Sequence, residues 1–304
     1  MEKKPILAYL ALTVVCIVWG TTYFAMRIGV ATFPPFLFSG IRHTIAGSLM
    51  LVLLKCSDRL STLTKSDIIR QTIPGILMVA LGNGIIGWSE KYIPSGLAAL
   101  IVSIMPVYIV AINYLSGADQ KKPNIQIITG LLLGSLGILM MFKDNVKDLA
   151  NPEYVLGMLI AFGACLAWAT GTIYAKHKPS KANIITNAAV QLTMGGITLL
   201  IMGAFFEDFN SLNTVSAASI WSLIYLIFFG SIVAYSCFVY AIKKLPLELS
   251  SIYAYVNPFI ALLLGFLFLD EKITSTTVLA LISALGGIYW INKGYQKQKI
   301  LAKG

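Results

Sequence analysis

The stretch WSEKYIPSGLAALIVSIMPVYI, residues 88–109, is matched 152 positions later by YAIKKLPLELSSIYAYVNPFIA, residues 240–261. The match pairs Pro106 with Pro258, and two further positions pair a lysine with a lysine and a proline with a proline. A proline inside a helix removes one backbone hydrogen bond and bends the helix. We therefore expect these two prolines to kink equivalent helices in the two halves of the chain.

A second pair of segments recurs at nearly the same distance. CIVWGTTY at residues 16–23 lies 149 positions before CLAWATGT at residues 165–172. One such match would be chance, but a series at a nearly fixed offset indicates a duplication. The sequence therefore predicts two repeats, residues 1–147 and residues 148–304.

The composition is that of a membrane protein. Hydrophobic residues make up 57% of the 304 positions, charged residues 12%, and the mean hydropathy is +0.80, whereas soluble domains have about 25% charged residues. Apolar segments long enough to cross about 30 Å of hydrocarbon recur ten times. The first of them continues too far to be a cleaved signal peptide. We predict transmembrane helices at 6–27, 34–55, 71–92, 96–116, 124–142, 154–175, 183–206, 219–241, 248–269 and 273–292.

The predicted fold is thus an all-α integral membrane protein of ten transmembrane helices. Because each repeat holds five helices, an odd number, the second repeat enters the membrane from the opposite side, as in inverted-topology transporters. Seventeen of the 23 lysines and arginines fall in segments on one side of the membrane and four on the other. Basic residues concentrate on the cytoplasmic side, so we expect both termini in the cytoplasm. The same rule explains the net charge of +10 without nucleic-acid binding.

Several function classes lack their motifs. The four cysteines stand singly without metal-ligand spacing, no GxxxxGK[ST] motif for ATP occurs, and nothing indicates a cofactor or a metal. A polytopic membrane enzyme would need converging catalytic groups, which two scattered histidines do not supply. A transporter is the leading hypothesis, and a channel or uncoupled facilitator of the same fold remains open.

Four segments resemble a known family. They are WGTTYFAMRIG in the first span, GIRHTIAG in the second, EKYIPSGLAALIVSIMPVYIV leading into the fourth and ELSSIYAYVNPFIALLLGFLFLDEKIT in the ninth. They resemble the drug/metabolite transporter superfamily, and within it the ten-helix EamA-like permeases of bacteria. The resemblance implies a secondary transporter of the bacterial cytoplasmic (inner) membrane. It would export amino acids, related small metabolites or drugs by alternating access. It also implies a central cavity lined by helices 1, 3, 4, 6, 8 and 9.

Aromatic, hydroxyl and amide side chains on those helices are the candidate substrate contacts. Trp19 and Trp168 occupy equivalent positions within their spans, away from the interfacial belt where membrane tryptophans concentrate. As a set, the rings would favour amphipathic or aromatic substrates through stacking and cation–π contacts, although packing explains each one separately as well. The full set is Trp19, Thr21, Tyr23, Asn83, Trp88, Tyr108, Trp168, Thr172, Tyr235, Tyr240, Tyr253 and Asn257.

Charged residues in or near spans carry the remaining hypotheses. Burying Arg42 in helix 2 costs about 2.5–3.5 kcal/mol, so it needs partners. We interpret it as a structural charge that ties helix 2 to its neighbours, with a substrate carboxylate as the alternative partner. Glu90 and Arg27 are predicted at similar depth, where they would form a gate or hold a coupling proton. Burial would favour proton binding to Glu90 and an adjacent arginine would oppose it. The alternative for Glu90 is a charge that reaches the lipid headgroups.

Small residues spaced four apart occur in helices 5 and 10, at Gly130 and Gly134 and at Ala280 and Ala284. Such spacing lets two membrane helices approach closely. The contact can lie within the chain or in a homodimer, and the sequence leaves both open.

Overall fold

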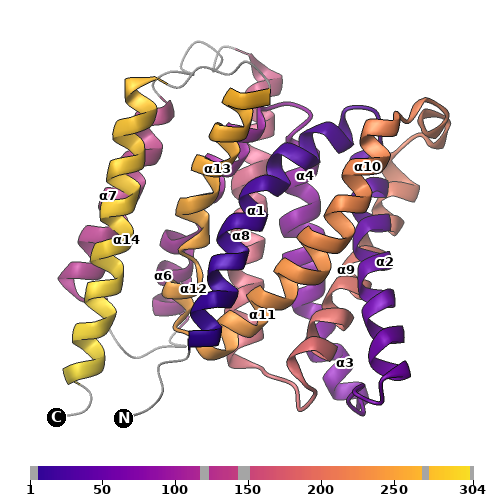
Figure 1. Ribbon diagram of the computed structural model, residues 1–304, viewed down its shortest axis with the longest axis horizontal. Helices are drawn as coiled ribbons and strands as arrows, with labels where there is room; N and C mark the ends of the chain where they lie inside the picture. The colour runs from indigo at the N-terminus through magenta and orange to yellow at the C-terminus, as the bar shows by residue number, and fades with distance from the viewer. Residues whose placement is uncertain (1–5, 117–122, 143–150, 269–273, 302–304) are drawn as a thin grey trace.

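The computed structural model describes residues 6–116, 123–142, 151–268 and 274–301 (Figure 1). These residues form helices and short connections, and no strand occurs among them. Six of the helices are long and apolar enough to cross a membrane. They are α1 (Ile6–Val30), α2 (Pro35–Cys56), the run of α3 (Lys65–Pro74), η1 (Gly75–Gly84) and α4 (Ile85–Ser89), α8 (Pro152–His177), α9 (Ile184–Phe206), and the run of α10 (Ala217–Tyr225), η4 (Leu226–Val233) and α11 (Ala234–Lys244).

The other four predicted spans hold helices that are interrupted or have shorter apolar stretches. They are α5 (Ser95–Val102) with α6 (Met105–Leu115), α7 (Ile125–Phe142), α12 (Leu247–Ser250) with α13 (Tyr253–Phe268), and α14 (Ser275–Leu301). A 3₁₀ helix, η3 (Phe209–Thr214), joins α9 to α10. The prediction of an all-helical protein with several membrane spans is confirmed for the described residues. The number ten stays a prediction.

The two paired prolines lie differently in their helices. α5 ends at Val102 and α6 begins at Met105, so the helix is interrupted just before Pro106. Pro106 lacks the N–H that would bond back across this break. In the second half the interruption lies earlier, between α12 and α13, and Pro258 sits inside α13. The pairing of prolines in the sequence therefore does not mark equivalent breaks.

Two long helices widen into π-helical turns near their middle, at η1 and at η4. A π-helical segment changes which residues share a helix face and is frequent at functional sites. The hydropathy pattern continues unbroken through both segments, so the sequence contains no signal for them.

Helices from the two halves of the chain exchange partners. α1 packs against α10, α11 and α13, and α8 packs against α3, η1, α4 and α6. We call these sets the α1 group (α1, α10, η4, α11 and α13) and the α8 group (α8, α3, η1, α4 and α6). Each group is thus completed by a first helix from the other half of the chain. α5 contacts both α1 and α8 and lies between the groups.

α2 and α9 form a close pair at one edge of the molecule. A Cβ atom added at Gly47 would lie 2.5 Å from the backbone nitrogen of Thr193, and one at Gly196 would collide with the backbone of Thr44. The contact is therefore reciprocal, and each glycine makes room for the threonine-bearing turn of the other helix.

Glu207 caps α2 from the far end of α9. The backbone N–H groups of Phe36 and Leu37 donate to its two carboxylate oxygens at 2.7 and 2.8 Å. The first N–H groups of a helix have no partner within the helix, and α2 has no side-chain cap of its own at Pro34. The carboxylate supplies the missing acceptors.

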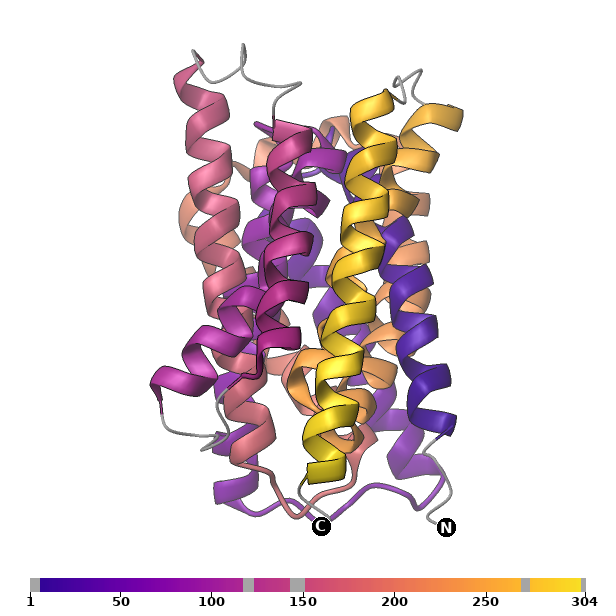
Figure 2. The same ribbon diagram turned by 90° about the vertical axis from the view of Figure 1, so that its left-hand side faces the viewer.

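α7 and α14 stand together at the opposite edge (Figures 1 and 2). A Cβ atom at Gly130 would lie 2.6 Å from the carbonyl oxygen of Gly287 in α14, and one at Gly134 would meet the Tyr255 ring of α13. These glycines are used for packing within the chain. Ala280 is buried, and nothing is described of the Ala284 side chain, so a homodimer stays a prediction.

Candidate functional site

A cavity lies between the α1 group and the α8 group. Its free space, including the part open to solvent, is about 520 Å³. The α1 group contributes Trp19, Thr22, Tyr23, Met26 and Tyr253; the α8 group contributes Gly82, Asn83, Ile86, Glu90, Met105, Ala164, Cys165 and Trp168; Val102 comes from α5 and Arg42 from α2. The walls are mostly apolar and aromatic, with one acidic and one basic side chain.

Four rings form an aromatic cluster at the cavity, made of Trp19, Trp168, Tyr253 and Phe238. Trp19 meets Trp168 edge to face at a centroid distance of 5.4 Å and Tyr253 at 4.9 Å. Phe238 lies 4.9 Å from Trp19, 5.6 Å from Trp168 and 5.5 Å from Tyr253 and is not itself a lining residue. The cluster therefore joins α1, α8, α11 and α13 behind the cavity wall.

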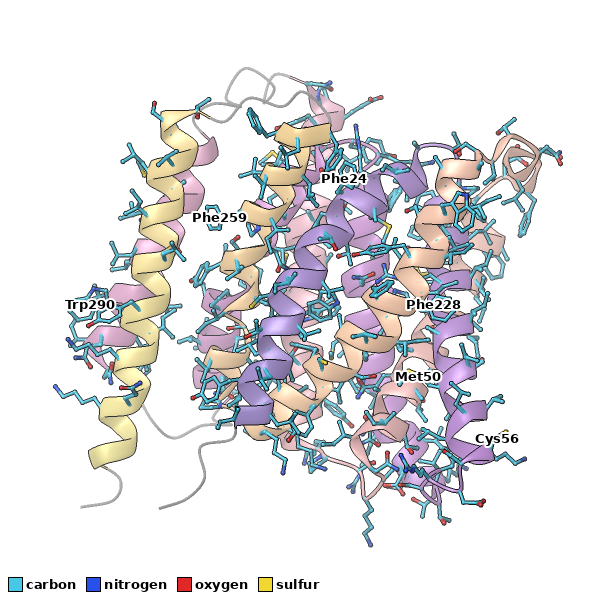
Figure 3. All side chains as sticks on the ribbon, in the orientation of Figure 1. Phe24, Met50, Cys56, Phe228, Phe259 and Trp290 are labelled. Carbon is cyan, nitrogen blue, oxygen red and sulfur yellow. The ribbon has the colours of Figure 1, made fainter. Side chains whose placement is uncertain are left out.

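A backbone carbonyl in η4 orients one ring of the cluster. The Trp19 indole N–H donates to the backbone oxygen of Gly230 at 3.1 Å. Because η4 is π-helical at this point, its hydrogen-bond pattern differs from that of an α-helix. Trp290, by contrast, lies on the outer edge of α14, away from α1 and α8 (Figure 3).

Glu90 is buried at the cavity with an unpaired carboxylate. Its side chain is 1% exposed. Within the part of the chain that the structure describes, neither carboxylate oxygen accepts a hydrogen bond. Burying such a group costs free energy unless it is paired or neutralised. Among the described residues, Glu90 therefore has a buried carboxylate without a hydrogen-bond partner, on which the charges of Arg27 and Arg42 act.

Arg27 lies beside Glu90, as the sequence suggested, but contacts it differently. Its guanidinium donates to the backbone carbonyl oxygen of Glu90, and to that of Ile93 at 3.2 Å. The last carbonyls of a helix have no partner within it and attract cations, and Glu90 follows the last residue of α4. Arg27 thus binds the end of a helix and leaves the carboxylate unpaired.

Arg42 ties three helices together and also lines the cavity. Its Nε donates to Ser231 Oγ at 2.8 Å and its Nη1 to Asn83 Oδ1 at 3.3 Å. His43 contacts the same two side chains at 3.1 Å (Asn83) and 3.3 Å (Ser231). Asn83 lies in η1 and Ser231 in η4, so both π-helical segments present their polar residue to α2. The resemblance implied a cavity without helix 2, and in this respect it was wrong.

Five of the twelve predicted contact residues line the cavity: Trp19, Tyr23, Asn83, Trp168 and Tyr253. The other seven do not: Thr21, Trp88, Tyr108, Thr172, Tyr235, Tyr240 and Asn257.

Several of these seven have partners elsewhere. Thr21 pairs with Tyr225 at 2.5 Å, and the Thr172 hydroxyl donates to Trp168 in its own helix. Trp88 packs against Phe36. They were predicted because they lie on the right helices, but each helix turns only one face to the cavity.

The comparisons with known proteins agree with this architecture. The sequence model of the EamA-like transporter family matches residues 6–143 and 155–293. The chain belongs to the EamA-like transporter family. Among the relatives of this EamA-like chain is the "Uncharacterized inner membrane transporter YedA" of Escherichia coli (strain K12), which is 31% identical over 84% of this chain and 80% of the relative.

Two further matches cover nearly the whole EamA-like chain. The "Uncharacterized transporter YvbV" of Bacillus subtilis (strain 168) is 27% identical over 97% of this chain and 94% of its own. A solved structure titled "Crystal structure of protein" shares the fold with a TM-score of 0.73 at 18% identity, over 93% of this chain and 96% of the other. The family and these relatives are transporters, not enzymes. The EamA-like chain is accordingly a multi-pass transporter of the bacterial inner membrane.

Proposed function

We propose that this EamA-like protein is a secondary transporter that exports small organic metabolites, amino acids or related compounds, or drugs by alternating access. The observation that carries the proposal is the position of the cavity between two groups of helices, each completed by a helix from the other half of the chain. Secondary transporters built from inverted repeats place the substrate between two such units, which move against each other. A cavity inside a single rigid bundle would not permit that motion.

The proposed topology is ten helices in two inverted five-helix repeats, with both termini in the cytoplasm. The charge distribution of the loops supports it, and so does the match of one family model to two successive segments. Contacts also recur at the sequence offset of 149: Gly47 lies against Thr193, and Gly196 lies against Thr44. Gly47 corresponds to Gly196 and Thr44 to Thr193, so each repeat supplies the same glycine and the same threonine.

The lining residues favour a particular substrate chemistry. The aromatic cluster offers faces and edges for stacking, and the unpaired Glu90 carboxylate accepts a cationic or hydrogen-bond-donating group. Arg42 adds a positive charge to the same cavity. We propose amphipathic or aromatic substrates that present a polar group to these charges, with export coupled to a proton that binds Glu90.

The test begins with purified protein in detergent and a thermal-shift screen of amino acids, nucleobases, organic cations and aromatic acids. Compounds that raise the unfolding temperature are then assayed for uptake into proteoliposomes with and without a pH gradient. Wild-type protein should accumulate the compound only with the gradient, and a protonophore should abolish the accumulation. Glu90→Gln should keep exchange of the compound across the membrane but lose accumulation driven by the gradient.

Glu153→Gln is the matched control, because Glu153 is an exposed glutamate in the first turn of α8 and its substitution should leave the pH dependence unchanged. Transport that is independent of pH in both wild type and Glu90→Gln would refute proton coupling and leave the facilitator as the better description. Absence of transport for every stabilising compound would refute the proposed function itself.

A further inference from the structure

Each half of the chain contains a basic residue that holds the end of a helix. On α1, Arg27 donates to the carbonyl oxygens of Glu90 and Ile93, where α4 ends. On α8, Lys176 donates to the carbonyl oxygens of Ile242 at 2.5 Å and Leu245 at 2.9 Å, where α11 ends.

The two contacts are equivalent by sequence. Lys176 lies 149 positions after Arg27, the offset that relates their two helices. The carbonyl groups of Ile242 and Leu245 lie 152 positions after those of Glu90 and Ile93, the offset that relates α11 to α4. In both copies one side-chain nitrogen therefore donates to two carbonyl oxygens, although Arg27 is replaced by a lysine and Glu90 by an isoleucine in the second copy.

Both contacts cross the interface at the cavity, and they cross it in opposite senses. Arg27 belongs to the α1 group and holds the α8 group; Lys176 belongs to the α8 group and holds the α1 group. They also lie at opposite ends of the molecule, because α4 lies in the upper half of Figure 1 and α11 in the lower half. A cation near the free carbonyls of a helix end is stabilising, and the attraction weakens steeply as the groups separate.

We propose that Arg27 and Lys176 are a pair of equivalent latches, each of which holds the two groups together at its own end of the molecule. The proposal rests on the alternating-access function, since separating the groups at one end breaks one contact and leaves the other as the pivot. Both contacts are present in the described structure. Opening to either side then requires the loss of one of them.

The two latches differ in how they are joined to the cavity. The anchor of Arg27 is the backbone of Glu90, whose carboxylate lines the cavity. The anchor of Lys176 is the backbone of Ile242, a buried apolar residue. A ligand that binds the Glu90 carboxylate therefore contacts the residue whose backbone anchors Arg27, whereas Ile242 is not a lining residue of the cavity.

The test uses Cys165, a cavity residue that is 1% exposed, as a reporter of opening. The other cysteines are replaced (Cys16→Ala, Cys56→Ser and Cys237→Ala), and a membrane-impermeant thiol reagent is added to right-side-out or inside-out vesicles. Arg27→Gln should speed labelling from one side by about fivefold or more, the effect of losing one such bond on an equilibrium. Lys176→Gln should speed labelling from the other side by a similar factor.

Exposed neighbours provide the controls. Lys91→Gln and Lys178→Gln remove the same charge near each end, at side chains exposed to solvent, and should leave both labelling rates unchanged. Arg27→Lys copies the other latch and should restore wild-type labelling, which separates a latch from a residue needed only for folding. Two results would overturn the proposal. One is that Arg27→Gln and Lys176→Gln both speed labelling from the same side; the other is that neither speeds labelling although the unfolding temperature is unchanged.

The outcome is independent of the substrate screen. Opposite shifts in labelling, together with no transport of any compound tested, would leave the latches standing and count against the proposed function. Proton-driven transport with no change in labelling rate would support the proposed function and count against the latches.

Discussion

Arg42 and Gln191 occupy equivalent positions, yet only one of them carries a charge. Gln191 donates to Gln71 at 2.5 Å and accepts from the Tyr235 hydroxyl at 2.7 Å, so an amide is enough to tie α9 to α3 and α11. Arg42 ties α2 to η1 and η4 in the corresponding way. Burying an arginine costs about 2.5–3.5 kcal/mol on insertion scales. We therefore expect the charge of Arg42 to act in the cavity, which this residue also lines, as well as in packing.

Arg42→Gln places the residue of the second repeat in the first and separates the two roles. We expect the free energy of unfolding to fall by about 1–3 kcal/mol, because charged hydrogen bonds to Ser231 and Asn83 are lost while the burial of a charge is relieved. Ligands with a carboxylate should lose about tenfold in affinity, the effect of one charge-assisted contact. Thermal unfolding with and without ligand measures both effects. Arg59→Gln, at an exposed arginine, should change neither.

A fall in stability with unchanged affinity for every ligand would mean that Arg42 serves only the structure, which is how the sequence alone was interpreted.

At the scale of the helix pair, the close contact between α2 and α9 depends on glycines, which have no side chain. The backbones meet at Gly47 and Gly196, where a Cβ atom has no room. Membrane helices gain little from hydrophobic burial against each other, so such close backbone contact is a main source of their association. The same pair is held at one end by the Glu207 carboxylate.

Gly47→Ala should separate the pair, and Gly163→Ala should not. The first substitution places a methyl group against the Thr193 backbone and should cost about 1–3 kcal/mol, as overpacking does. At Gly163 nothing lies within 4 Å of an added Cβ atom, so the better helix propensity of alanine, worth up to about 1 kcal/mol, should appear as a small stabilisation. Thermal unfolding of both variants in one detergent measures the difference. Equal effects at the two sites would refute the close contact.

At the scale of the whole molecule, the aromatic cluster joins the two groups behind the cavity. Trp168 comes from the α8 group, and Trp19, Phe238 and Tyr253 come from the α1 group. Rings packed edge to face add about 0.5–1.5 kcal/mol per pair beyond the area they bury. The cluster therefore holds the groups together, and we expect Phe238 to block a path behind the cavity.

Phe238→Ala should open that path. We expect faster movement of a transported compound down its own gradient, together with weaker accumulation when a pH gradient is applied, because the barrier behind the cavity is removed. The free energy of unfolding should also fall by about 3–5 kcal/mol, as for other buried phenylalanines. Proteoliposome fluxes measured in both modes give the ratio of leak to coupled transport. Phe266→Ala, at a phenylalanine 49% exposed, should leave the ratio unchanged, and an unchanged ratio for Phe238→Ala would exclude a barrier role.

The sequence predicted a great deal of this molecule for a simple physical reason. Hydropathy reports which segments lie in the membrane, and the apolar segments coincide closely with the helices. It does not report which face of each helix meets which neighbour. Phe238 was therefore missed, Tyr240 was wrongly placed at the cavity, and the π-helical turns around Asn83 and Ser231 left no trace in the residue pattern.

The carbonyl contacts of Arg27 and Lys176 escaped notice for a related reason. A side chain that binds the backbone leaves no complementary residue to find, since every residue has a carbonyl group. The repeat offset was the available signal, because it relates the two basic residues to each other.

The tertiary cap on α2 has a consequence for how the protein is made. Phe36 and Glu207 are 171 residues apart, and chain elongation at about 5–20 residues per second separates their synthesis by roughly 10–30 s. During that interval α2 has been synthesised, but the Glu207 carboxylate that accepts from two of its N–H groups has not. The α9 backbone that packs against Gly47 is also still missing. In the newly synthesised first half of the chain, α2 thus lacks its packing and capping partner. Biogenesis of the transporter includes an interval that ends when α9 is synthesised.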